Sequence, residues 1–100
     1  MRRLLFSVDG QHLVKQGDFS GITAGSKGYL KCCFGVDGSD WRGAKKVALF
    51  NETCAVAVDE ALECCVPDEV TGGKSFKVRL IGQKGTMRVT TNAVLVEQTL

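Results

Sequence analysis

The cysteines are the residues of this 100-residue chain with the most obvious chemistry, and there are five of them, four in two adjacent pairs: Cys32, Cys33, Cys54, Cys64 and Cys65. Zinc sites use cysteines separated by two to four residues, a spacing that does not occur here. Adjacent residues of a strand point to opposite faces of the sheet, so each pair places one thiol inside and one outside. The pattern favours reduced thiols acting as small apolar side chains, with a structural disulfide or a metal as the alternatives.

Other catalytic and ligand-binding patterns are weak. His12 is the only histidine, so any cysteine or serine nucleophile would depend on it, and no catalytic signature surrounds a cysteine. Asp37 and Asp40 lack the closing glutamate of a calcium loop. The Gly-Ser-Lys-Gly segment at 25–28 lacks the spacing of a phosphate-binding loop. The sequence therefore predicts no catalytic residue, no cofactor and no metal site.

The charge balance argues against a polyanion as the obligatory partner. There are 13 basic and 11 acidic residues, so the net charge is +2, and the basic residues are spread along the chain. Nucleic acid and membrane are therefore not expected as partners. Ser7 and Asp9 interrupt the first apolar run, so we expect a first strand there rather than a signal peptide.

Short apolar runs separated by glycine-containing turns dominate the chain and predict an all-β fold. The runs cover residues 4–8, 12–15, 29–36, 46–51, 54–58, 61–66, 75–81, 86–91 and 93–98. A helix over 56–69 is disfavoured by its poor apolar stripe and by Pro67, which leaves a single helical turn at 67–70. About eight or nine short strands at this spacing predict one domain over residues 1–100, an antiparallel β-sandwich or a small barrel.

Two features of the chain suggest binding. Residues 17–28 form a long glycine-rich loop, and such a loop in a small domain suggests an interface that orders on assembly. The interface candidates within it are Gly21, Ile22, Gly25 and Lys27. Trp41 follows a polar turn, and we expect it to plug one end of the core, with a partner anchor as the alternative.

Three segments together resemble a known family: Ser-Asp-Trp-Arg-Gly-Ala-Lys-Lys-Val-Ala-Leu-Phe at 39–50, Glu-Cys-Cys-Val-Pro-Asp-Glu-Val at 63–70, and Phe-Lys-Val at 76–78 running through Gly82 to Thr-Thr-Asn at 90–92. In this order they are similar to the N-terminal domain of baseplate upper proteins of tailed bacteriophages and prophages. The resemblance implies an immunoglobulin-like sandwich that docks on other particle proteins. It also implies framework roles for Trp41, Gly43, Phe50, Pro67 and Phe76.

Three functions follow as hypotheses. The first is a virion structural protein, either a tail or baseplate adaptor or a capsid decoration module, assembled in the host bacterial cytoplasm as a homo-oligomer or in symmetric copies. In the similar family a stalk and a distal binding region follow this domain, and the chain stops at Leu100, so no host-binding role is expected. The second is a non-virion phage protein that inhibits a host factor or sequesters a ligand. The third is an enzyme that uses His12 with a cysteine.

Overall fold

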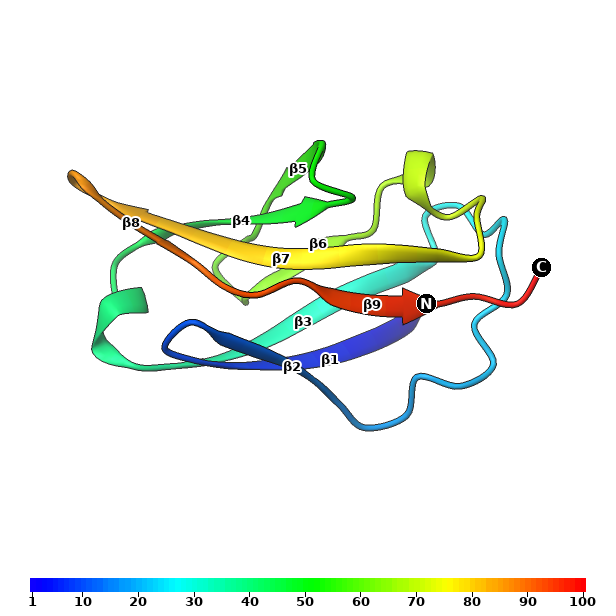
Figure 1. Cartoon of the computed structure of the whole chain (residues 1–100), viewed down its shortest axis with the longest axis horizontal. Coiled ribbons are helices and arrows are strands. Elements are labelled where there is room, and N and C mark those ends of the chain that lie inside the picture. Colours follow the sequence, from blue (N-terminus) through cyan, green and yellow to red (C-terminus); the bar gives the residue numbers. More distant parts are fainter.

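The computed structural model describes all residues from 1 to 100 and shows nine strands in two facing sheets (Figure 1). The four-stranded sheet, in the order β2-β1-β3-β6, contains β1 (Arg2–Asp9), β2 (His12–Gln16), β3 (Leu30–Asp37) and β6 (Glu63–Cys65). The five-stranded sheet contains β5 (Cys54–Ala57), β4 (Lys45–Phe50), β7 (Ser75–Lys84), β8 (Met87–Thr90) and β9 (Val94–Glu97). The 3-10 turns are η1 (Ser39–Trp41) and η2 (Asp68–Val70).

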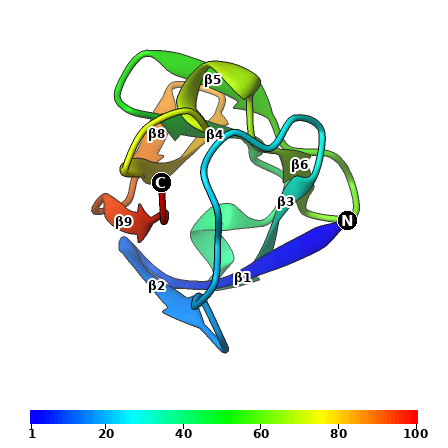
Figure 2. The same ribbon diagram turned by 90° about the vertical axis from the view of Figure 1, so that its right-hand side faces the viewer.

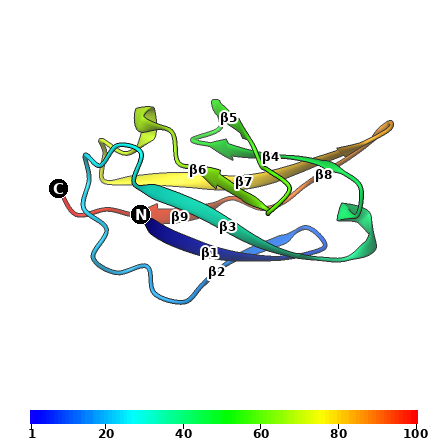
Figure 3. The ribbon, with the colours of Figure 1, turned by 180° about the vertical axis from the view of Figure 1, so that it is seen from behind.

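The predicted all-β sandwich is confirmed, because each of the nine apolar runs overlaps one strand and η2 lies in the predicted turn at 67–70. One pairing departs from the antiparallel expectation. Strands β1 and β3 are parallel, from Arg2 opposite Leu30 to Asp9 opposite Asp37. A parallel pair needs a crossover of a dozen or more residues. Strand β2 runs back toward the start of β1, and the segment 17–29 carries the chain from there to β3 on the other side of β1 (Figure 3).

Strands β8 and β9 pair with opposite ends of β7. Between them, Asn92 lies in no strand, and its side chain forms hydrogen bonds that link this sheet to the other. The Leu13 amide donates a 2.7 Å hydrogen bond to Asn92 Oδ1, and Asn92 Nδ2 donates to the Leu13 carbonyl at 3.0 Å. The Lys15 ammonium donates to the Leu95 carbonyl at 2.9 Å. The two bonds of Asn92 satisfy part of the outer edge of β2, which lies below β9 in the end-on view (Figure 2).

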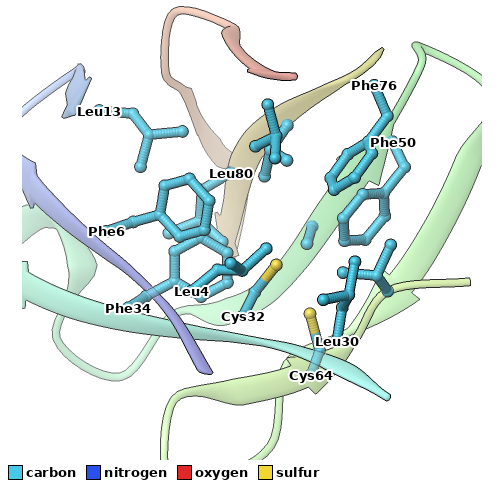
Figure 4. Close-up of a cluster of buried hydrophobic side chains, with 14 of the residues drawn as sticks. Leu4, Phe6, Leu13, Leu30, Cys32, Phe34, Phe50, Cys64, Phe76 and Leu80 are labelled. Atoms are coloured by element: carbon cyan, nitrogen blue, oxygen red, sulfur yellow. The ribbon is translucent and has the colours of Figure 1, made fainter. Parts of the chain in front are cut away.

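Aromatic side chains fill the space between the sheets (Figure 4). Phe6 and Phe34 stack on neighbouring strands with ring centroids 5.3 Å apart, and Phe50 and Phe76 meet at 6.2 Å in the other sheet. All four are nearly fully buried. Alternation along each strand places them inward, so their burial supplies much of the apolar stabilisation of the fold.

The cysteine pairs are split between the two faces, as predicted. Cys32 and Cys64 are buried and stand opposite each other on β3 and β6, and their sulfur atoms lie side by side in Figure 4. Cys33 is half-buried and Cys65 is exposed, and all five thiols are free. Hydrogen bonding to Cys64, together with burial, raises the pKa of the Cys32 thiol well above its ordinary value. The same hydrogen bond lowers the pKa of the Cys64 thiol. Cys32 is therefore a protonated core residue at neutral pH.

Candidate docking surface

The outward side of the five-stranded sheet carries apolar side chains that no other element covers. Alternation in β4 turns Ala48 and Phe50 into the core and Val47 and Leu49 outward. The same alternation in β7 turns Ile81 outward. We define the outer face by the apolar residues Val47, Leu49, Ala55, Ala57, Ile81 and Leu95 together with the basic residues Lys45, Lys77, Arg79 and Arg88.

The register of the strands makes the apolar residues of β5, β4 and β7 contiguous. Ala57 lies opposite Val47, which lies opposite Ile81 in the next strand. Ala55 and Leu49 form the adjacent row. Directly opposed side chains are about 5 Å apart, so these two rows form one patch. The two alanines are exposed and the three larger side chains are half-buried.

Four cations on β4, β7 and β8 border this patch, and three of them form no ion pair. Lys45 and Arg88 flank Gln83 at one end, and Lys77 lies nearer the other end. Only Arg79 forms an ion pair, 3.2 Å from Glu52, and its buried Nε has no hydrogen-bond partner. The outer face therefore has an apolar centre with basic residues on β4, β7 and β8 and acidic residues at the β5 edge.

The outward side of the four-stranded sheet provides a contrast within the same molecule. There Arg3 and Lys31 both pair with Glu63, at 2.5 and 2.9 Å. Hydrogen bonds from Lys31 and Arg3 hold the pKa of the Glu63 carboxyl below its usual range. The cations of this sheet are thus compensated within the chain. Its exposed apolar residue is Leu5, on β1.

The other residues with chemical potential are dispersed. His12 is exposed on β2, and no hydrogen bond joins it to a cysteine or a carboxylate. No group of three or more histidine, cysteine, aspartate or glutamate side chains is placed to hold a metal ion. The largest hollow, about 530 Å³, is a shallow groove between the start of β4 and the turn at 58–62. No helix of the structure is long and apolar enough to span a membrane.

The predicted interface loop is fastened to the body of the protein. Thr99 donates from its amide to the Ile22 carbonyl at 2.7 Å, and the Gly25 amide donates to the Thr71 carbonyl at 2.7 Å. The side chain of Ile22 is buried in the core, so it is not available to a partner. Gly21, Gly25 and Lys27 are exposed, and their role in an interface stays a prediction.

The residues predicted to be framework lie in two settings. Trp41, Phe50 and Phe76 are almost completely buried. Trp41 closes one end of the sandwich, and its Nε1 donates a 2.7 Å hydrogen bond to the Gly10 carbonyl. Gly43, with a φ of 74°, follows η1, and Pro67 precedes η2. The large aromatic residues thus serve the core.

The outer face was not among the residues singled out from the sequence, although a signal for it exists. The β4 segment carries apolar side chains on both of its faces, Val47 and Leu49 on one and Ala48 and Phe50 on the other. A two-layer sandwich buries only one face of each sheet. A strand that is apolar on both faces therefore indicates a surface that needs a further cover.

Comparisons with protein families, with curated proteins and with solved structures found no match to this chain.

Proposed function

We propose that this chain is a docking module that binds another protein through the outer face and carries out no catalysis. The observation that supports the proposal is the uncovered apolar patch of Val47, Leu49, Ile81 and their alanine neighbours. Burying apolar surface gains about 25 cal/mol per Å², and contiguous apolar patches rimmed by polar residues mark interaction sites. The patch lies on a surface that the chain itself does not cover.

Strands β4 and β7, which carry most of the patch, are each paired on both sides, and their rigidity favours binding. Strand β7 pairs with β4 on one side and with β8 and β9 on the other, and β4 also pairs with β5. Side chains mounted on such paired strands are held before a partner arrives, so little conformational entropy is lost on binding. The geometry favours a rigid surface that meets a complementary surface.

The experiment that tests the proposal places a photo-crosslinking amino acid on each sheet in turn. Ala57 is an exposed position on the outer face, and Leu5 is an exposed control on the opposite sheet. Each variant is expressed in cells that naturally produce the chain and is then irradiated. We expect a discrete protein adduct from Ala57 and none from Leu5, and Ile81→Asp should abolish it while the circular dichroism spectrum is retained. An adduct from Leu5 alone, or one unaffected by Ile81→Asp, would overturn the proposal.

The finer part of the proposal is that the partner belongs to a virus particle, and it is supported only by the resemblance to baseplate proteins. A tail or baseplate adaptor and a capsid decoration module would both use such a surface. The chain should then be detected by quantitative mass spectrometry in purified particles. Near-parity with the major capsid protein indicates decoration, and a small fixed fraction indicates the tail or baseplate. Absence from particles, with abundance in the producing cells, would reject the virion role and leave docking on a host protein.

A further inference from the structure

We infer that the partner presents an acidic protein surface with an apolar centre to the outer face. This inference rests on the docking function proposed above and specifies the chemistry of the partner. Its starting point is the order of side chains along β7, in which Lys77, Arg79, Ile81 and Gln83 all point outward. Lys45 and Arg88 stand on either side of Gln83. Cations therefore occupy both ends of the patch.

The spacing of these cations defines the complementary surface. Lys77 and Gln83 are six residues apart, and a strand rises about 3.4 Å per residue, so the two cationic ends are about 20 Å apart. Arg79 and the apolar rows lie between them. A fitting partner has carboxylates at two places about this far apart and small or branched apolar side chains between.

The charges of the outer face are only partly compensated within the chain. Glu52, which pairs with Arg79, and Glu97, which points outward from β9, border its four cations. Asp59 and Glu60 line the groove beside Lys45 and Val47 at the β5 edge. Lys45, Lys77 and Arg88 have no carboxylate within 4.0 Å. The four-stranded sheet shows that the fold does supply a bridging carboxylate elsewhere, because Glu63 serves both Arg3 and Lys31. Three cations of the outer face therefore lack an ion-pair partner within the chain, and carboxylates on a partner protein would supply one.

A second copy of the chain does not fit this surface. Two outer faces brought together would place cations against cations, and such like-charge contacts are unfavourable. Two copies that paired through their β5 edges would repel each other through acidic residues, because Glu52 precedes β5 and Asp59 and Glu60 follow it. An antiparallel copy would set these acidic ends side by side.

Nucleic acid also fits poorly. Single-stranded nucleic acid is held by aromatic side chains that stack on the bases, and the outer face contains none. The phosphate backbone offers nothing apolar to cover Val47, Leu49 and Ile81. A protein surface satisfies both the cations and the apolar centre.

The test uses the crosslinker at Ala57 and asks what it captures and which charges are needed. The adduct is digested, and the attached peptide is sequenced by mass spectrometry. We expect an acidic segment with apolar residues between its carboxylates. The double reversal Lys77→Glu with Arg88→Glu should lower the adduct yield about tenfold or more, in line with the effect of electrostatic steering on association. The exchange Lys77→Arg with Arg88→Lys should retain it, as should the reversal of two exposed cations off this face, Arg42→Glu with Lys84→Glu.

The outcomes separate this inference from the docking function. An adduct that survives the double reversal, or a captured segment without acidic residues, would overturn the acidic partner and leave docking intact. An adduct of twice the chain mass, or one removed by nuclease, would overturn it in favour of a second copy or of nucleic acid. If the chain that carries the crosslinker at Ala57 and no charge reversal forms no adduct, the docking function itself is refuted.

Discussion

Replacing Gly82 by alanine should destabilise the fold, chiefly through a clash with the indole ring of Trp41. A Cβ at this position would lie 2.8 Å from Cζ3 and 2.9 Å from Cε3 of the indole, and 3.1 Å from Cγ1 of Val89. Carbon atoms are at their best separation at about 3.5–4.0 Å, so the ring would have to move by about 0.7 Å or more. The indole is not free to move, because it is 1% exposed and its Nε1 is bonded to the Gly10 carbonyl at 2.7 Å.

The expected change in the free energy of unfolding has two contributions, the cost of the clash and a smaller gain from the unfolded chain. Overpacking a close-packed core costs about 1–3 kcal/mol. The alanine also stabilises the folded protein by about 0.4–1 kcal/mol, because it restricts the conformations of the unfolded chain. The net loss is therefore between about 0 and 2.6 kcal/mol, and its midpoint of about 1.3 kcal/mol lowers the melting temperature of a domain of this size by about 5–10 °C. Gly72→Ala is the matched control, since no atom lies within 4 Å of its Cβ position and its φ is not positive.

Thermal and urea unfolding, followed by circular dichroism, measure the effect. Trp41→Phe should couple with Gly82→Ala, so that the double variant loses less stability than the sum of the two single variants, by about 0.5 kcal/mol or more. A Gly82→Ala melting temperature equal to that of Gly72→Ala, or strict additivity with Trp41→Phe, would refute the reasoning.

Three further predictions concern the link between the sheets, an ion pair and the thiols. Asn92→Ala removes both hydrogen bonds to Leu13 and should lower the free energy of unfolding by about 1–3 kcal/mol in urea titrations; an unchanged midpoint would contradict the link. Glu63 has a lowered pKa in the folded protein, so its stabilisation is present above the ordinary value of 4.5 and is lost as the pH falls through the lowered folded pKa. Glu63→Gln should flatten that acid-dependent loss, and an identical pH profile in both proteins would rule the contribution out. A maleimide should label Cys65 in the folded protein and Cys32 only in denaturant, and mass spectrometry showing early labelling of Cys32 would contradict its burial.

The sequence predicts the strands well because their apolar alternation and glycine turns are local properties. The runs that became β4 and β7 are examples, since each shows which residues share a face. The parallel pairing of β1 with β3 is not local. It depends on the path of residues 17–29, and nothing in the composition of that loop specifies the side on which it returns.

The candidate site was harder to predict for a related reason. Lys45, Lys77 and Arg88 lie far apart in the sequence and appear there as scattered charges. Only the register of β4, β7 and β8 brings them to one face. The prediction for Ile22 was wrong in the other direction, because this interface candidate lies in the core. The Thr99 amide donates a hydrogen bond to the Ile22 carbonyl, a contact that the local sequence does not indicate.

The most direct test of the central claim is side-chain carbene footprinting of the chain, free and in the complex purified from its natural source. Leu95 on the outer face and Leu5 on the opposite sheet form a matched pair, with 43% and 47% exposure in the free chain. Docking through the outer face predicts that Leu95 and Ile81 lose labelling in the complex while Leu5 is labelled as before. Protection of Leu5 with unchanged labelling of Leu95 and Ile81 would contradict the claim.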